Sequence, residues 1–199
     1  PTTGSCFSFW YNMYGQHIGT LNVYIQLQNG GNQTVWSLRG DQGNQWYNGQ
    51  TPIQSTAPYQ IIIEGVRGAG YAGDIAIDDL SFLSSICGVQ PAAAAVTGKP
   101  LINVTTMPTT APVMGQLFCN FDTSPCGWTQ DQTDNFDWTR LRGPTSTTLT
   151  GPNADHGGSG YYFYIETSFP RRRGEKARLI SPLQQPGLSC FSFWYNMYG

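Results

Sequence analysis

Charge is scarce in this chain of 199 residues. Only 10 residues are basic and 12 acidic, 11% of the sequence in all, and the formal net charge is −2. This scarcity excludes a charge-rich coiled coil and a chain kept disordered by its own charge. It also argues against nucleic-acid binding, which needs a basic surface. Long apolar runs are missing too, because the longest hold about five residues, far fewer than the roughly 20 of a membrane span.

Glycine and aromatic residues are plentiful instead, with 24 Gly and 14% aromatic residues. Within residues 20–28, every second residue from Leu21 to Leu27 is apolar. This period of two indicates a half-buried strand, and residues 59–64 and 74–80 are shorter versions of it. Because glycine-rich turns separate these segments, the sequence predicts an all-β module of short antiparallel strands.

One segment occurs twice. The eleven residues SCFSFWYNMYG fill positions 5–15 and again, without a change, positions 189–199. Cys6 and Cys190 are therefore equivalent, and the offset is 190 minus 6, or 184 residues. A repeat of this kind predicts one period of a tandem array with overlapping ends. The alternative is an artificial duplication.

The repeat changes how the five cysteines are counted. Since Cys6 and Cys190 hold the same place in successive repeats, each repeat has four cysteines, and the others are Cys87, Cys119 and Cys126. An even number is typical of disulfides formed in an oxidising compartment. The spacings lack the C-x2-C pairs of zinc and thiol-exchange sites.

A Pro- and Thr-rich stretch of low charge, residues 89–118, predicts an extended linker between domains. It contains an N-glycosylation sequon at Asn103, and a second sequon begins at Asn32 on an expected turn. The linker threonines predicted to carry glycans are Thr105, Thr106, Thr109 and Thr110. We therefore interpret residues 1–88 as the C-terminal half of one domain and residues 119–199 as the N-terminal half of the next.

Ordered motifs in both halves carry a family resemblance. The front half reads Cys119-Asn120-Phe121-Asp122, Cys126-Gly127-Trp128, Phe136-Asp137-Trp138 and Gly160-Tyr161-Tyr162. The back half reads Phe9-Trp10-Tyr11, Gly19-Thr20-Leu21 and Gly73-Asp74-Ile75-Ala76-Ile77-Asp78-Asp79, then Cys87. This pattern resembles the MAM domain, which is named after meprin, A5 (neuropilin) and receptor phosphatase mu.

The resemblance implies a jelly-roll β-sandwich stapled by two disulfides, Cys6–Cys87 and Cys119–Cys126. On the chain-entropy account, the long Cys6–Cys87 loop would contribute roughly 4–5 kcal/mol and the short loop about 2.5 kcal/mol. Cys190 would then pair beyond the end of this chain. Alternatively, the two halves close on each other, and the two copies of one strand compete for one position. The sequence leaves both arrangements open.

The resemblance also nominates a structural cation, Ca²⁺ or Na⁺, held by Asp122, Asp155 and Asp79. Oxygen ligands suit such ions, and Asp79 shares the expected strand face of Ile75 and Ile77, where a carboxylate needs a partner. Ordinary hydrogen-bonded carboxylates are the alternative. Adjacent Asp78 and Asp79 are expected on opposite faces of a strand, so they do not suggest the carboxylate pair of a glycosidase.

Other motifs have simpler structural explanations. The only histidines are His17 and His156, and HExxH, GxSxG and phosphate-binding glycine loops are missing, so we predict that the chain is not an enzyme. Arg39-Gly40-Asp41 spells an integrin-binding tripeptide, although turn chemistry also explains its glycine. The tryptophans expected in the core, rather than in a sugar-stacking platform, are Trp10, Trp36, Trp46, Trp128 and Trp138. The basic residues expected at a solvated hairpin tip, rather than in a heparin-type or acidic-partner patch, are Arg171, Arg172, Arg173, Lys176 and Arg178.

Together these features predict an extracellular protein, secreted or at the cell surface, with a structural or adhesive function. Its partners would be copies of itself, in oligomers or filaments, or other extracellular proteins or glycans, and many weak contacts would act together. Two alternatives stay open. One is a MAM module in a receptor or membrane-enzyme ectodomain, which mediates adhesion or dimerisation. The other is a carbohydrate-binding jelly roll, which would show an exposed aromatic row.

Overall fold

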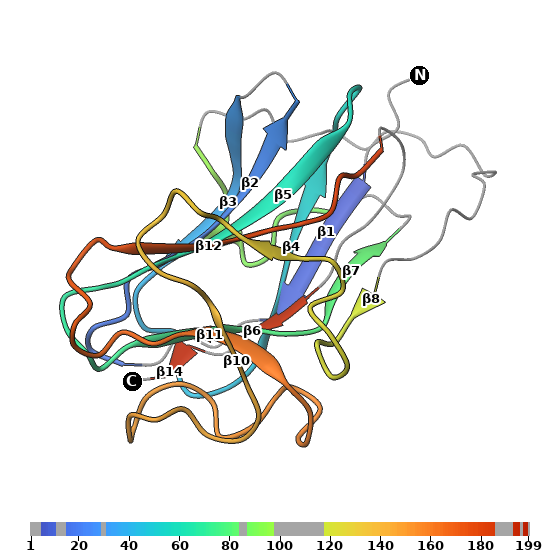
Figure 1. Cartoon of the computed structure of the whole chain (residues 1–199). Helices are drawn as coiled ribbons and strands as arrows, with labels where there is room; N and C mark the ends of the chain where they lie inside the picture. The colour runs from blue at the N-terminus through green and yellow to red at the C-terminus, as the bar shows by residue number, and fades with distance from the viewer. Residues whose placement is uncertain are drawn as a thin grey trace.

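The computed structural model describes residues 5–10, 15–28, 31–83, 87–97, 118–185, 193–195 and 197–198, and for residues 5, 7–10, 83, 193–195 and 197–198 it describes the backbone alone. Figure 1 shows an all-β fold. Within the described part of the chain the single helical element is a 3-10 turn, η1 (Ala92–Ala94), and no helix there is long and apolar enough to cross a membrane. The residues with sequence-based assignments that lie outside the described ranges are Asn103, Thr105, Thr106, Thr109, Thr110 and Cys190.

One layer of the fold is a sheet with the strand order β3-β2-β5-β12-β9. Its strands are β2 (Thr20–Leu27), β3 (Asn32–Arg39), β5 (Tyr59–Val66), β9 (Thr129–Gln130) and β12 (Lys176–Ile180). All pairings in this sheet are antiparallel. Strand β2 covers the expected alternating segment, so the strongest sequence pattern forms an inner strand of this layer, between β3 and β5.

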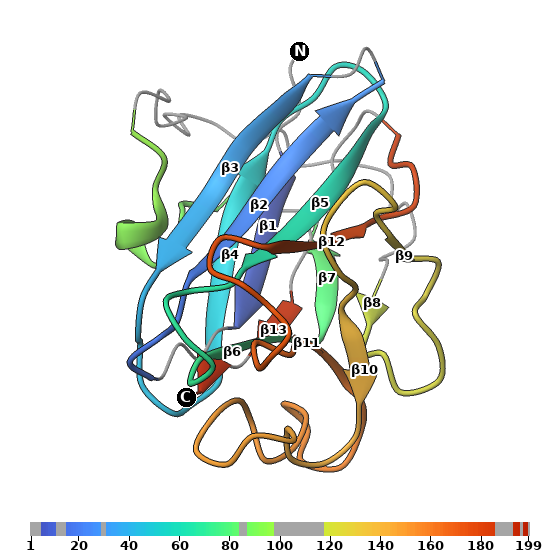
Figure 2. The ribbon, with the colours of Figure 1, turned by 60° about the vertical axis from the view of Figure 1, so that its left-hand side comes forward.

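The opposite layer consists of two sheets, β13-β4-β1-β7-β8 and β10-β11-β6-β14. The strands of the first are β1 (Ser5–Trp10), β4 (Tyr47–Ile53), β7 (Leu80–Leu83), β8 (Phe118–Cys119) and β13 (Phe193–Tyr195). The strands of the second are β6 (Asp74–Ile77), β10 (Thr139–Leu141), β11 (Tyr162–Ile165) and β14 (Met197–Tyr198). In Figure 2, β2, β3 and β5 lie in front of β1, β4 and β7, as the two layers of a sandwich.

The core lies between the layers because each strand presents alternate apolar residues to it. Leu21, Val23 and Ile63 from the first layer join one buried cluster with Ile75 and Ile77 from the second. Burial of such side chains is the main favourable contribution to folding of a sandwich. The predicted all-β jelly-roll-type fold is confirmed.

Both halves of the chain contribute strands to this one sandwich. Strand β5 pairs with β12, β6 with β11, and β7 with β8, so residues before the linker pair with residues after it. Disulfides join Cys6 to Cys87 and Cys119 to Cys126, with Cα atoms 5.0 and 6.0 Å apart. In this chain, therefore, the halves close on each other, which is one of the two arrangements that the sequence left open. The domain boundaries in a longer array stay a prediction.

Candidate functional site

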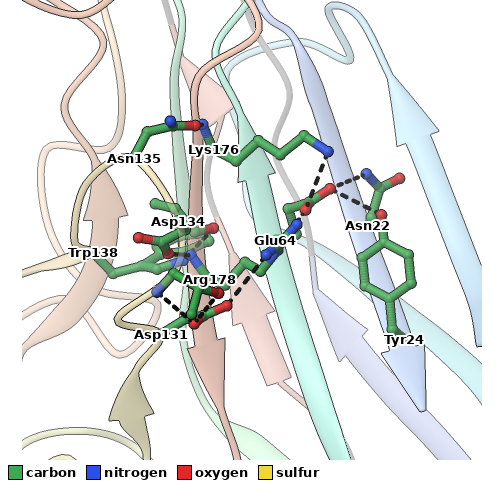
Figure 3. Close-up of polar contacts among 11 residues, drawn as sticks. Asn22, Tyr24, Glu64, Asp131, Asp134, Asn135, Trp138, Lys176 and Arg178 are labelled. Carbon is green, nitrogen blue, oxygen red and sulfur yellow. Dashed lines mark hydrogen bonds and ion pairs between the residues drawn. The ribbon is translucent and has the colours of Figure 1, made fainter. Parts of the chain in front are cut away.

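A row of polar side chains crosses the outer face of the first layer, on the side away from the core. It comprises Ser37 of β3, Asn22 and Tyr24 of β2, Glu64 of β5, Lys176 and Arg178 of β12, and Asp131 after β9. We call it the polar ladder; most of it is drawn in Figure 3. The strand residues among them share the outer face because, along each strand, they alternate with residues that face the core, namely Val23, Ile63, Ala177 and Leu179.

Glu64 is the centre of the polar ladder. Its Oε1 accepts hydrogen bonds from Asn22 Nδ2 (3.0 Å) and from the Tyr24 hydroxyl (2.9 Å). Its Oε2 accepts a 2.7 Å bond from Arg178 Nε and lies 3.6 Å from Lys176 Nζ. Arg178 Nη1 also donates to Asp131 Oδ2 at 3.2 Å. These contacts, dashed in Figure 3, form one continuous network across three strands and a loop.

Glu64 is only 1% exposed although it lies on the outer face. Burial alone would raise its pKa, but the hydrogen bonds from Arg178, Tyr24 and Asn22 outweigh burial and hold the pKa of Glu64 below its ordinary value. Glu64 is therefore a carboxylate whose charge is neutralised within the chain. An outer face with such internally paired charges opposes the approach of a second protein less than one with isolated like charges.

The loop after β9 covers the part of β12 that β9 itself does not pair. The backbone N–H of Arg178 donates to Asp134 Oδ2 at 2.6 Å, and that of Lys176 donates to Asn135 Oδ1 at 2.9 Å. The same two strand residues accept bonds from the backbone N–H groups of Asp131 and Asn135. A covered edge cannot add a further strand there.

The expected basic cluster is divided by the fold. Arg172 and Arg173 are exposed, as expected for a hairpin tip, and the Arg171 guanidinium lies 4.4 Å from the centre of the Phe136 ring. Lys176 and Arg178 belong to the polar ladder instead. The interpretation of all five as a solvated tip was wrong for these two, because residues of a strand alternate between faces and Glu64 lies beside them.

A shallow hollow continues the outer face at one end of β2 and β5. It is lined by Gln26, Leu27, Gln28, Gln60 and Leu183. Leu183 is 46% exposed, so an apolar group stands next to neutral amides. Neutral polar rims around an exposed apolar group are common at protein contacts.

A second polar region lies around β6 and the loop between β10 and β11. It comprises Asp74, Asp78, Asp79, Asp122, Asp155 and His156, and we call it the acidic cluster. The backbone N–H of His156 donates to Asp78 Oδ2 at 3.0 Å, and His156 Nδ1 lies 2.8 Å from Asp79 Oδ2. Both carboxylates thus reach the same residue. The expectation that Asp78 and Asp79 point to opposite faces was wrong, because Asp79 has a left-handed backbone (φ 48°) that interrupts the alternation between β6 and β7.

Two carboxyls of the acidic cluster are deeply buried. Burial and the nearby charge of Asp79 raise the pKa of Asp78 to about 9. Burial and the charge of Glu166 raise the pKa of Asp74 to about 7. Asp74 still accepts bonds from Thr150 and Thr167. Among the described residues neither carboxyl forms an ion pair with lysine or arginine.

The three expected cation ligands are not brought together as one set. Asp122 and Asp155 each have a carboxylate oxygen within 2.8 Å of the Cβ position at Gly160, so these two converge on a small space that only glycine leaves open. Asp155 is 8% exposed, and no donor among the described residues bonds its Oδ1, which suits a cation ligand. Asp79 is bonded to His156 instead, and within the described ranges no three His, Cys, Asp or Glu side chains group as a metal site.

The Arg39-Gly40-Asp41 tripeptide forms a turn at the end of β3. Arg39 and Asp41 are exposed, and Gly40 has φ 80°, which glycine adopts without strain. Asp41 Oδ1 accepts a bond from Gly43 N at 2.9 Å. This geometry accounts for the turn by local bonding; integrin binding stays a prediction. Asn32, the described sequon residue, is exposed at the start of β3.

The tryptophans with described side chains lie mostly in the core. Trp36, Trp128 and Trp138 are at most 4% exposed, and Trp46 packs against the core; the side chain of Trp10 lies outside the description. Trp138 Nε1 donates to Ala177 O at 3.0 Å. The core assignment is confirmed for these rings, so a sugar-stacking platform built from them is not favoured.

Sequence reasoning missed the polar ladder and the histidine between two aspartates. The available signal was a single charged residue at the end of Ile61-Ile62-Ile63-Glu64, and another within Ala177-Arg178-Leu179. A charge inside an apolar strand calls for a partner. The sequence does not say which strand supplies that partner.

The fold and its surface define a disulfide-stapled β-sandwich with a charge-paired outer face. The family model for the MAM domain, meprin/A5/mu, matches residues 1–88 and 119–199. The chain therefore belongs to the MAM domain family.

Similar proteins carry the same module within longer chains. MAM domain-containing glycosylphosphatidylinositol anchor protein 1 of Rattus norvegicus is 50% identical over 84 residues, 41% of this chain and 9% of that protein. Human MAM domain-containing glycosylphosphatidylinositol anchor protein 2 is 47% identical over 98 residues, 47% of this chain and 10% of that protein. Thyroid hormone-induced protein B of Xenopus laevis is 31% identical over 201 residues, 98% of this chain and 26% of that protein. This chain thus spans about a quarter of these relatives or less, and no solved structure matches it.

Proposed function

We propose that this chain is a segment of an extracellular adhesive or structural protein in which tandem MAM domains bind copies of one another. The observation that carries the proposal is the outer face of the first layer, where the carboxylates of Glu64 and Asp131 are balanced by the cations of Lys176 and Arg178. Two such faces can approach without opposing unpaired charges of one sign. The module itself would act by surface complementarity and not by catalysis.

The tandem arrangement adds valency to a weak contact. The match to thyroid hormone-induced protein B runs through both halves and the segment between them, in line with successive MAM modules. When several modules lie on one chain, each further contact forms at a high effective concentration. Extended assemblies, including filaments, would then follow from repeated head-to-tail contacts.

Extracellular placement is part of the proposal. Two disulfides close the sandwich, and such bonds persist in oxidising compartments. The names of two relatives describe proteins with a glycosylphosphatidylinositol anchor. They favour a second candidate function, a cell-surface adhesion module contacting a different extracellular protein.

A structural cation at Asp122 and Asp155 also belongs to the proposal. Its support is the convergence of these two carboxylates at Gly160, together with the buried Oδ1 of Asp155, which accepts no hydrogen bond from the part of the chain that the structure describes. A Ca²⁺ or Na⁺ ion there would draw its remaining ligands from backbone carbonyls and water. It would hold the loop between β10 and β11 against β8.

Clustering of beads coated with the full chain tests the self-association. Leu183→Asp places a charge in the hollow of the outer face and is expected to reduce the clustering rate at least tenfold. Leu149→Asp is the matched control, since Leu149 is an exposed leucine (74%) in the loop between β10 and β11, and clustering should be unchanged. Equal clustering of both variants and the wild type would exclude the outer face. Clustering only with beads that carry other extracellular proteins would favour the second candidate.

A further inference from the structure

Three loops meet at one end of the sandwich. They are residues 67–73 between β5 and β6, residues 143–151 between β10 and β11, and residues 167–174 between β11 and β12. Figure 1 shows the first and the third of these loops side by side, at the left of the view. We call the three loops together the loop end.

Hydrogen bonds hold the three loops against one another. Thr167 Oγ1 donates to Tyr71 O at 3.0 Å, which joins the third loop to the first. The hydroxyl oxygens of Thr147 and Ser168 lie 2.8 Å apart, which joins the second loop to the third. The loop end is therefore one connected surface of the fold.

Each loop carries one large apolar side chain that extends into solvent. Tyr71 is 61% exposed, Leu149 74% and Phe169 94%. They are three of the five large apolar residues that are exposed in the described part of the chain, and we call them the apolar tips. Exposed apolar groups that gather on one surface indicate contact with a protein or a membrane.

The backbone of the second loop holds Leu149 outward. Leu149 has φ 63°, a left-handed conformation that is unfavourable for any residue with a Cβ atom. The turn around it is fixed by Thr150, whose Oγ1 lies 2.7 Å from both Thr147 O and Asp74 Oδ2. An exposed leucine that the fold keeps in a strained conformation points to a function rather than to packing.

The loop end is also rich in arginine. It contains four of the ten basic residues of the chain and none of its twelve acidic residues. The four are Arg67, Arg171, Arg172 and Arg173. Within the described ranges none of them forms an ion pair. A surface with this charge attracts anionic ligands.

The acidic residues that border the loop end are bonded within the fold. Asp74 is buried, and Glu166 accepts hydrogen bonds from two serines. Glu175 Oε2 accepts a 3.0 Å bond from the backbone N–H of Arg172. The exposed guanidinium groups of Arg172 and Arg173 therefore stay available to a ligand.

Protruding apolar side chains next to arginines fit the interface of a phospholipid bilayer. Apolar side chains enter between the lipids while basic side chains meet the anionic headgroups, and a guanidinium forms paired hydrogen bonds with phosphate oxygens. A sulfated glycan would use the arginines but would gain little from Leu149. A protein partner would need a separate pocket for each of the three tips.

We propose that the loop end binds the surface of a phospholipid membrane with anionic headgroups, where the apolar tips enter the interface and Arg172 and Arg173 hold phosphate groups. This goes beyond the proposed function, since the partner is a lipid surface and not another module. The hollow around Gln60 and Leu183 lies at the start of β5, whereas the loop end follows the end of β5. A membrane-bound sandwich would thus keep the hollow accessible to a second chain.

Vesicle flotation with the full chain tests the apolar tips. Binding to phosphatidylcholine vesicles with roughly one-fifth phosphatidylserine is expected to be at least tenfold tighter than binding to phosphatidylcholine alone. Leu149→Ser combined with Phe169→Ser should weaken it at least tenfold. Leu183→Ser, at an exposed leucine outside the loop end, is the control and should bind as the wild type does. A urea unfolding transition shows that each variant is folded.

A second pair of variants tests the arginines. Arg172→Gln combined with Arg173→Gln should weaken binding at least fivefold at about 0.1 M salt, where charges act over roughly 10 Å. Arg39→Gln combined with Arg142→Gln removes the same charge from two exposed arginines outside the loop end, and it should leave binding within twofold of the wild type. Equal losses in the two pairs would overturn the assignment of the arginines, because net charge alone would then explain them.

Insertion of the tips has its own readout. In Phe169→Trp, brominated lipids should quench the tryptophan emission more than in the wild type, and Leu183→Trp should show no such increase. The proposal is overturned if the folded chain binds neither vesicle, or if the two serine substitutions leave binding unchanged. It is also overturned if the chain ignores vesicles and is retained on heparin through Arg172 and Arg173, which would identify a sulfated glycan as the ligand. Bead clustering is measured without lipid, so it decides the proposed self-association separately.

Discussion

The polar ladder and the acidic cluster both bury carboxylates, yet they do so in opposite ways. Glu64 in the ladder is 1% exposed and bonded to Arg178, while Asp74 and Asp78 in the cluster are at most 1% exposed and bonded to hydroxyl and backbone donors. The pKa of Glu64 lies below its ordinary value, and the pKa values of Asp74 and Asp78 are raised to about 7 and about 9. The three carboxyl groups are buried to a similar extent, so the bonding partner decides whether the pKa falls or rises.

The difference shows what each region can do. A carboxylate paired with a guanidinium stays ionised and holds two strands and a loop in register. Carboxyls without a cationic side chain become protonated or attract a cation from solution. The ladder therefore gives a surface with a fixed charge pattern, while the charge of the cluster depends on pH and on ions.

Removing the Arg178 cation from the polar ladder should change the free energy of unfolding more than any other variant considered. Arg178→Met keeps most of the side-chain volume but leaves Lys176, at 3.6 Å, as the one cation beside buried Glu64 among the described residues. We expect the free energy of unfolding to fall by about 3 kcal/mol, since one partner of a buried pair is lost. Urea unfolding at pH 7 measures it, and Arg172→Met at an exposed arginine should change the value by less than about 0.5 kcal/mol. Equal losses in the two variants would contradict the buried pair.

Adding a metal cation that binds the acidic cluster should raise the free energy of unfolding, by less than the loss of Arg178 lowers it. Millimolar Ca²⁺ is expected to raise the free energy of unfolding by about 2 kcal/mol, from binding to the folded state alone. Asp155→Asn should remove most of this increment, because it neutralises the buried oxygens next to Asp122. Asp137→Asn, at an exposed aspartate, should retain it. Titrating Ca²⁺ and Na⁺ during thermal unfolding distinguishes the ions, and no shift with either would exclude the cation.

The smallest expected effect is a change in pH dependence at Asp74. The pKa of Asp74 in the folded state, about 7, lies above its ordinary value of 3.8, so the folded state binds the proton more tightly. The resulting stability is complete below about pH 4 and is lost as the pH rises through about 7. Asp74→Asn mimics the protonated form and should flatten this decline, with a gain of about 1 kcal/mol at pH 7. Unfolding curves from pH 4 to pH 8 measure it, and a parallel decline in the variant would contradict the assignment.

Much of the fold could be predicted from sequence because its signals are local. The alternation from Leu21 to Leu27 depends only on the period of a strand, and β2 lies where it predicts. The acidic cluster was predicted only in part. Asp122 and Asp155 converge, but Asp79 does not join them, because its positive φ reverses the direction that simple alternation assigns. A single left-handed residue is a local conformation imposed by packing, and Asp is one of several residue types that tolerate it.

The sequence by itself determined an all-β module of low charge, the MAM motifs, the even set of cysteines per repeat and the presence of two identical strand copies. Tertiary structure alone decided which residues meet. Glu64 and Arg178 are 114 residues apart, and they bond because β5 and β12 pair in one register. That register also brings the two halves of the chain into one sandwich. The physical reason is that strand pairing acts between distant segments, and only the packed layers select one pairing among many.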